Sequence, residues 1–130
     1  MKLFKNFGKY ILTPLIAYLS GFYMYNSIIN IVWNQSLGNE MGAVLFYGAL
    51  AFLLVATPIY LLLINWMEIK FNKYHIFIFP SGCMCIFFIP TMFISALFGS
   101  FNPITSEALL FHAFFLTSGC VFGIGSAIFK

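Results

Sequence analysis

The run GAVLFYGALAFLLVATPIYLLLIN, residues 42–65, contains no charged side chain. A helix needs about 20 apolar residues to cross a hydrocarbon core about 30 Å thick. In lipid the polar groups of the backbone must be satisfied within the segment, which favours a helix. Three further runs of this kind lie at about residues 10–32, 76–98 and 108–129. We therefore predict an all-α protein in which residues 1–130 form a single integral membrane domain with four spans.

The composition places the chain among membrane proteins. Of its 130 residues, 62% are hydrophobic and 7% are charged, whereas about 25% of the residues of a soluble domain are charged. The six lysines form no basic stripe along a helix, so the net charge of +3 does not indicate nucleic-acid binding. The expected partner is the lipid bilayer.

The lysines predict the orientation of the spans. They precede the first span, separate the second from the third and end the chain: Lys2, Lys5, Lys9, Lys70, Lys73 and Lys130. The other two connections contain Glu40 and Glu107 but no lysine. Cytoplasmic loops of membrane proteins are enriched in lysine and arginine, so both termini are predicted to be cytoplasmic in a bacterial inner membrane. Short connections favour an antiparallel four-helix bundle with sequential helices as neighbours.

One ionisable side chain, His112, lies inside a predicted span, in the half that would face outward. The same depth is predicted for four polar residues of the first and third spans: Asn26, Asn30, Thr91 and Ser95. These residues form a candidate polar cluster. An ionisable residue within a membrane is costly to bury and is therefore a functional candidate. The alternative, which we favour, is a neutral imidazole that joins two helices by a hydrogen bond.

The last span contains a stripe of small residues. Gly119 and Gly123 form a G-x-x-x-G pattern, and Ala127 extends it by one turn. Such a stripe lets another helix approach closely, either within the bundle or in a second copy of the chain. In the third span, Pro80 and Pro90 each remove a backbone hydrogen bond and favour a kink.

The predicted spans contain no carboxylate and no Cys-x-x-Cys pair, so we predict no catalytic, cofactor-binding or metal-binding residue, and no enzyme. One hypothesis is a non-catalytic accessory, regulatory or immunity-type factor that contacts itself or another membrane protein through helix–helix contacts. The alternative is a small homo-oligomeric transporter, channel or holin-like pore, with the polar cluster along its path.

Two stretches carry a resemblance to a known group of proteins: FYGALAFLLVATPIYLLL, residues 46–63, and FHAFFLTSGCVFGIGSAIF, residues 111–129. With the use of lysine in place of arginine, they resemble the uncharacterised small four-span membrane proteins of low-GC Gram-positive bacteria. The resemblance implies the four-span topology and assigns no activity or site residue.

Overall fold

The computed structural model describes residues 1–97 and 105–130, and within these ranges every regular element is a helix. Phe98, the predicted end of the third span, and the side chain of Glu107 lie outside what the structure describes. The elements are α1 (Lys2–Phe7), η1 (Gly8–Leu12), α2 (Thr13–Trp33), η2 (Gly38–Glu40), α3 (Met41–Ala51), η3 (Phe52–Ala56), α4 (Thr57–Lys70), α5 (His75–Ile86), α6 (Phe88–Leu97) and α7 (Ser106–Ile128).

Four helical stretches are long and apolar enough to cross a membrane, which confirms the four predicted apolar helices. They are Lys2–Trp33, Gly38–Lys70, His75–Leu97 and Ala108–Ile128. The first two extend well beyond the predicted boundaries, because hydropathy marks the apolar part of a helix while helical hydrogen bonding continues into the charged flanks. The architecture is therefore compatible with a membrane protein of four spans.

Two of these long helices contain a π-helical turn, and a Thr-Pro pair follows each one. The turn η1 precedes Pro14 and the turn η3 precedes Pro58. A proline ring inside a helix crowds the carbonyl one turn earlier and removes a hydrogen bond. In both helices the residue before the proline donates its backbone N–H to the carbonyl five residues back, which widens the turn.

The third span is interrupted at Phe87, between α5 and α6. Phe87 has φ −91° and ψ −1°, outside the regular helical geometry. Pro90 has no N–H to give to the carbonyl four residues earlier, and the helix breaks in that interval. The break confirms the predicted distortion of the third span. Phe87 itself lies in the interior and is 9% exposed.

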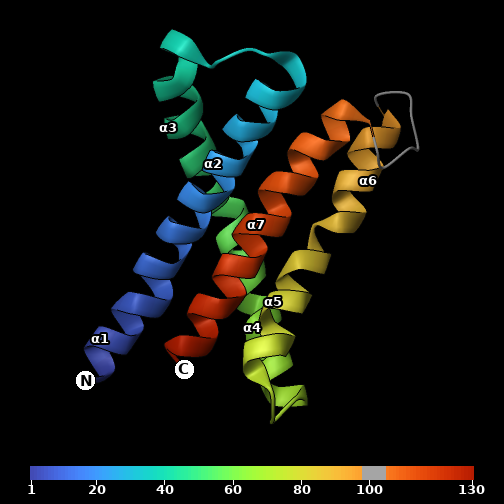
Figure 1. Ribbon diagram of the computed structural model, residues 1–130. Coiled ribbons are helices and arrows are strands. Elements are labelled where there is room, and N and C mark those ends of the chain that lie inside the picture. Colours follow the sequence, from blue (N-terminus) through green and yellow to red (C-terminus); the bar gives the residue numbers. More distant parts are fainter. Residues whose placement is uncertain (98–104) are drawn as a thin grey trace.

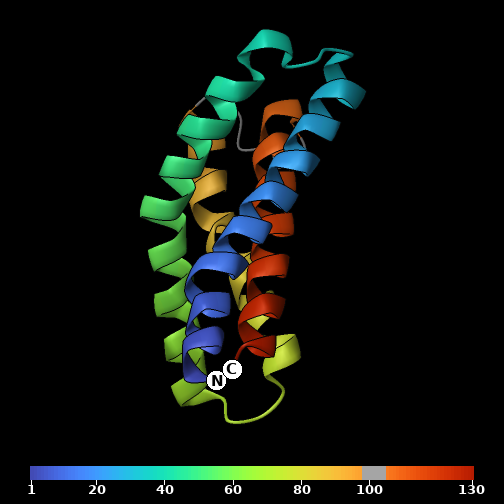
Figure 2. The same ribbon diagram turned by 90° about the vertical axis from the view of Figure 1, so that its left-hand side faces the viewer.

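The two termini lie at one end of the molecule together with the connection between α4 and α5, and the connection between α2 and α3 lies at the other end (Figure 1). In both views α7 runs beside α2 (Figure 2). The closest packing in the chain joins α7 to α2 on one side and to α5 on the other. The last helix is therefore the central element of the fold.

The core is built around α7 and is largely aromatic. Tyr60 is fully buried, stacks on Phe122 with ring centroids 4.8 Å apart and meets Phe87 edge-on at 5.1 Å. In contrast, α3 buries no residue. It is also absent from the close packing that holds α7, so the short connection before α3 does not bring the first and second spans into close contact along this part of their length.

Candidate functional site

The structure places three of the predicted polar residues on neighbouring helices. His112 on α7 is 8% exposed and stacks on Phe88 of α6, with ring centroids 5.1 Å apart. Thr91 and Ser95 lie three and seven residues after Phe88 and are also buried. The contact between α6 and α7 therefore brings His112 close to the face that carries both hydroxyl groups.

The hydroxyl groups of Thr91 and Ser95 are already satisfied within α6. Thr91 donates to the carbonyl of Phe87 at 2.6 Å, and Ser95 donates to the carbonyl of Thr91 at 2.9 Å. Nε2 of His112 is buried and has no hydrogen-bond partner among the described residues. Among the described residues, His112 contacts the neighbouring helix by stacking on Phe88 and not by a hydrogen bond from Nε2.

Asn26 and Asn30 belong to α2, which packs against α7 from the side away from α6 (Figure 1). Asn26 is half-buried and Asn30 is exposed. Within the described part of the chain, no hydrogen bond joins either asparagine to His112. A single site shared by all five polar residues stays a prediction that this geometry does not favour.

The small-residue stripe of α7 lies against the backbone of α5. A Cβ atom built on Gly119 would lie 2.5 Å from the carbonyl oxygen of Cys83, and one on Gly123 would lie 2.6 Å from the carbonyl carbon of Phe79. Ala127, one turn further on, packs against the core. Only glycine allows this approach, so α5 occupies the stripe within the chain, and the stripe is not free to bind a second copy.

An apolar cavity of about 380 Å³ lies where the first and second spans are not in close contact. It is bounded by α2, α3, η3 and α7, with Phe87 contributed from the break in the third span. The aromatic residues that line it are Tyr18, Phe22, Tyr25, Phe52, Phe87, Phe111, Phe114 and Phe115, and the others are small or aliphatic: Val44, Gly48, Ala51, Val55 and Ala56.

Tyr18 links the two helices that border the cavity. Its hydroxyl donates a 2.8 Å hydrogen bond to the carbonyl of Leu45 on α3. The hydroxyl oxygen passes so close to Gly48 that a Cβ there would lie 2.5 Å away, so a side chain at this position would displace it. The Tyr18 ring also meets Phe52 at 5.5 Å and Phe114 at 6.0 Å, and these two rings lie 5.9 Å apart. Three aromatic rings from three spans meet here.

The cavity is open at its rim, so its space is filled from outside the protein. Water is a poor occupant, since it needs polar partners and apolar cavities stay dry. The apolar lining is therefore suited to apolar matter from the surroundings of the protein.

Sequence reasoning did not predict the cavity, although three signals point toward it. Tyr18, Phe22 and Tyr25 follow each other at helical spacing in the first span, and Phe111, Phe114 and Phe115 do so in the last. The second span presents small residues, Gly48 and Ala51, at comparable depth. Aromatic stripes opposite small residues are compatible with tight packing as well as with a cavity, so the pattern alone does not separate the two.

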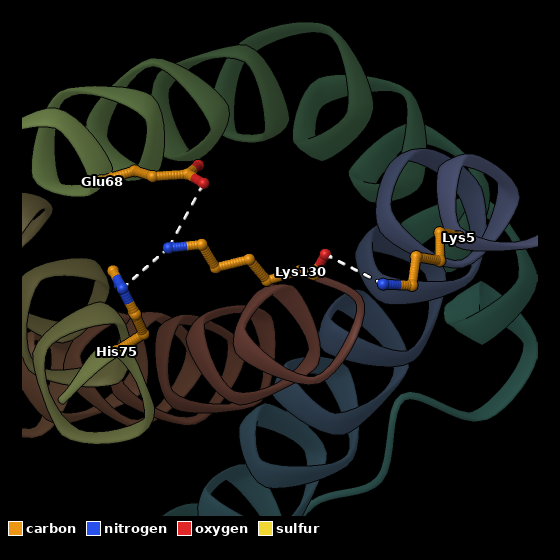
Figure 3. Close-up of polar contacts among 4 residues, drawn as sticks. All are labelled: Lys5, Glu68, His75 and Lys130. Atoms are coloured by element: carbon orange, nitrogen blue, oxygen red, sulfur yellow. Dashed lines mark hydrogen bonds and ion pairs between the residues drawn. The ribbon is translucent and has the colours of Figure 1, made fainter. Parts of the chain in front are cut away.

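Charged side chains gather at the end of the molecule where the termini lie (Figure 3). Nζ of Lys130 lies 3.4 Å from a carboxylate oxygen of Glu68 and 2.7 Å from Nε2 of His75, and Lys5 donates to the backbone carbonyl of Lys130 at 3.3 Å. An ammonium group has no acceptor, so Nε2 of His75 is the acceptor in this contact. The Lys130 and Glu68 side chains are about one-third exposed, and such ion pairs are worth about 0–1 kcal/mol. This contact joins the ends of several helices without forming an enclosed site.

Within the described residues, no three His, Cys, Asp or Glu side chains come close enough together to hold a metal ion. Among the described residues, the apolar cavity is a formed candidate site, and its lining suits an apolar ligand. Comparisons of the chain with protein-family models, with curated proteins and with solved structures found no match.

Proposed function

We propose that this chain is a non-catalytic, multi-pass protein of a bacterial inner membrane, of the small four-span kind that it resembles. It is an antiparallel four-helix bundle with both termini in the cytoplasm. It acts as an accessory, regulatory or immunity-type factor in contact with another membrane protein or with a second copy of itself.

The distribution of lysine carries the orientation. All six lysines lie in the terminal segments, at the end of α4 or in the connection between α4 and α5. These places lie together at one end of the molecule (Figure 1). Cationic loops are retained on the cytoplasmic side during insertion. The opposite end, with the connection between α2 and α3, carries Glu40 and no lysine.

Helix α3 provides the surface for a partner. The glycine stripe of α7 is occupied by α5, whereas α3 buries no residue within the chain. Phe46, Leu50 and Leu54 lie four residues apart along α3 and η3, and they are 60%, 43% and 73% exposed. In a bilayer such a stripe faces lipid, and it leaves α3 accessible to another apolar helix.

The structure gives less support to a pore. The buried hydroxyl groups of Thr91 and Ser95 bind carbonyls of their own helix, and the cavity beside α2 is lined by apolar side chains. A water-filled path needs polar groups that are free to bind water or ions along its length. An accessory role needs none.

Two experiments test the proposal. The first uses a variant with its three cysteines replaced and a membrane-impermeant maleimide. We expect the maleimide to label Gln35→Cys in intact cells, and Asn72→Cys only after the membrane is permeabilised. The reverse pattern would refute the orientation.

The second experiment tests for a pore. Vesicles containing the purified protein alone should retain a small trapped dye as well as protein-free vesicles do. Release of the dye would refute the accessory role and support the pore.

A further inference from the structure

We propose that the cavity between α2, α3 and α7 is a binding site for one acyl chain of a membrane lipid. The proposal goes beyond the accessory role and rests on the proposed function only in that the protein lies in a bilayer. It requires no particular orientation and no particular partner.

The position of the cavity along the helices gives a lipid chain access to it. On α2 its lining runs from Tyr25 to Tyr18, and on the second span from Val44 to Ala56. At 1.5 Å per residue these stretches extend about 10 Å and about 18 Å along the helix axes. The cavity therefore begins near the end of the molecule that carries the connection between α2 and α3 and reaches toward the middle of the spans, which is the path of an acyl chain within one leaflet.

The cavity opens toward the surface that faces lipid. Val55 and Phe111 line it and are 57% and 36% exposed, so its rim belongs to the outside of the molecule. Phe52 and Ala56 line it as well but are only 3% and 4% exposed. An acyl chain enters at the exposed rim and reaches side chains that a lipid on the outside of the bundle does not touch.

The size of the cavity fits a small apolar ligand. It holds about 380 Å³, within the range of about 300–1,000 Å³ that is usual for small-ligand sites. The lining offers aromatic faces and aliphatic groups, and the hydroxyl of Tyr18 is engaged with Leu45. Such walls suit an unsubstituted hydrocarbon.

The test uses a phospholipid with a photoreactive diazirine near the end of one acyl chain. The full chain is reconstituted in vesicles that contain this lipid, irradiated, digested and examined by mass spectrometry. We expect labelling of Phe52 and Ala56 at the buried part of the cavity. Ile89 on α6, which is 77% exposed and does not line the cavity, reports contact with the surrounding lipid in every sample.

Two matched variants link the labelling to the cavity. Ala51→Trp places a large side chain in the cavity, and Ala43→Trp places the same side chain on an exposed position of α3 that does not line it. We expect Ala51→Trp to lower labelling of Phe52 and Ala56 at least fivefold, with Ile89 labelled as before. Ala43→Trp should change neither. If Ala51→Trp does not fold, as judged by gel filtration, Val44→Phe fills the cavity in its place.

Labelling confined to exposed residues such as Ile89 would overturn the proposal, since it shows surrounding lipid only. Labelling of Phe52 and Ala56 that the filling variants leave unchanged would overturn it too. Both results are independent of the maleimide and dye-release experiments, so failure of the lipid site and failure of the accessory role are distinguishable.

Discussion

Replacement of Gly119 by alanine tests whether α7 is held by close backbone contact with α5. The added Cβ would lie 2.5 Å from the carbonyl oxygen of Cys83 and 2.8 Å from its carbonyl carbon. Ordinary contacts begin at 3.4 Å, so the two helices must move apart by about 0.9 Å at this point. Neither backbone can relieve the overlap by changing a rotamer, because the atoms that collide belong to the helix itself.

The magnitude follows from two opposed effects. Overpacking a well-packed interior costs about 1–3 kcal/mol. Alanine recovers up to about 1 kcal/mol, because it is a better helix former than glycine. We expect a net loss of about 1–2 kcal/mol, which raises the unfolding equilibrium constant about 5–30-fold. The double variant Gly119→Ala/Gly123→Ala should cost less than the two single variants together, since one separation of α7 from α5 relieves both overlaps.

The measurement is unfolding by dodecyl sulfate in mixed micelles, followed by the fluorescence of Trp33 and Trp66. Gly42→Ala is the matched control, because a Cβ at Gly42 meets nothing within 4 Å. The control should be as stable as the natural chain or slightly more stable. If Gly119→Ala unfolds at the same detergent ratio as Gly42→Ala, the close approach of α7 and α5 does not exist.

Three further predictions use the same unfolding assay. Tyr18→Phe should lower stability by about 1 kcal/mol through loss of the hydrogen bond to Leu45. Adding Gly48→Ala to this variant should lower stability little further, because both substitutions disable the same contact. Fully additive losses would contradict this account. His112→Phe should leave the stability unchanged or raise it by up to about 1 kcal/mol. The substitution keeps the stacking on Phe88 and removes a buried nitrogen that has no partner among the described residues. A clear loss of stability would show that the imidazole makes a polar contact. Glu68→Gln should lower stability by less than about 1 kcal/mol, and the difference should disappear in high salt, since the ion pair with Lys130 is about one-third exposed; a larger loss that salt does not change would point to a buried role for Glu68.

The existence of the four helices could be predicted, because the bilayer thickness sets the length of an apolar run and lipid leaves the backbone few alternatives to a helix. The distortion near Phe87 was predictable for a similarly local reason, since Pro80 and Pro90 lack a hydrogen-bond donor wherever the helix lies. The stripe of Gly119 and Gly123 indicated a close approach of backbones, while α5 as the neighbouring element became visible only in the structure.

The predicted polar cluster shows why the remainder could not be predicted. Depth in the membrane follows from counting residues, and by that count Asn26, Asn30 and His112 lie at similar levels. The direction in which each side chain points depends on which helices are neighbours. Because α7 lies between α2 and α5 and also meets α6, residues of equal depth on α2 and α6 face opposite sides of it.

The cavity depends on the balance between helix–helix packing and contact with lipid, which the hydropathy of a sequence does not describe. In water, two apolar helices joined by a short connection are driven together along their whole length, because exposed apolar surface is costly. In lipid that drive is absent, since acyl chains solvate an apolar side chain as well as a neighbouring helix does, and contact depends on packing and hydrogen bonds. Tyr18 provides one such contact between α2 and α3: its hydroxyl donates to the carbonyl of Leu45 and lies against Gly48. The length of a tyrosine keeps the helices joined and also keeps them apart, so the same residue that ties α3 to the bundle holds open the space that an acyl chain fills.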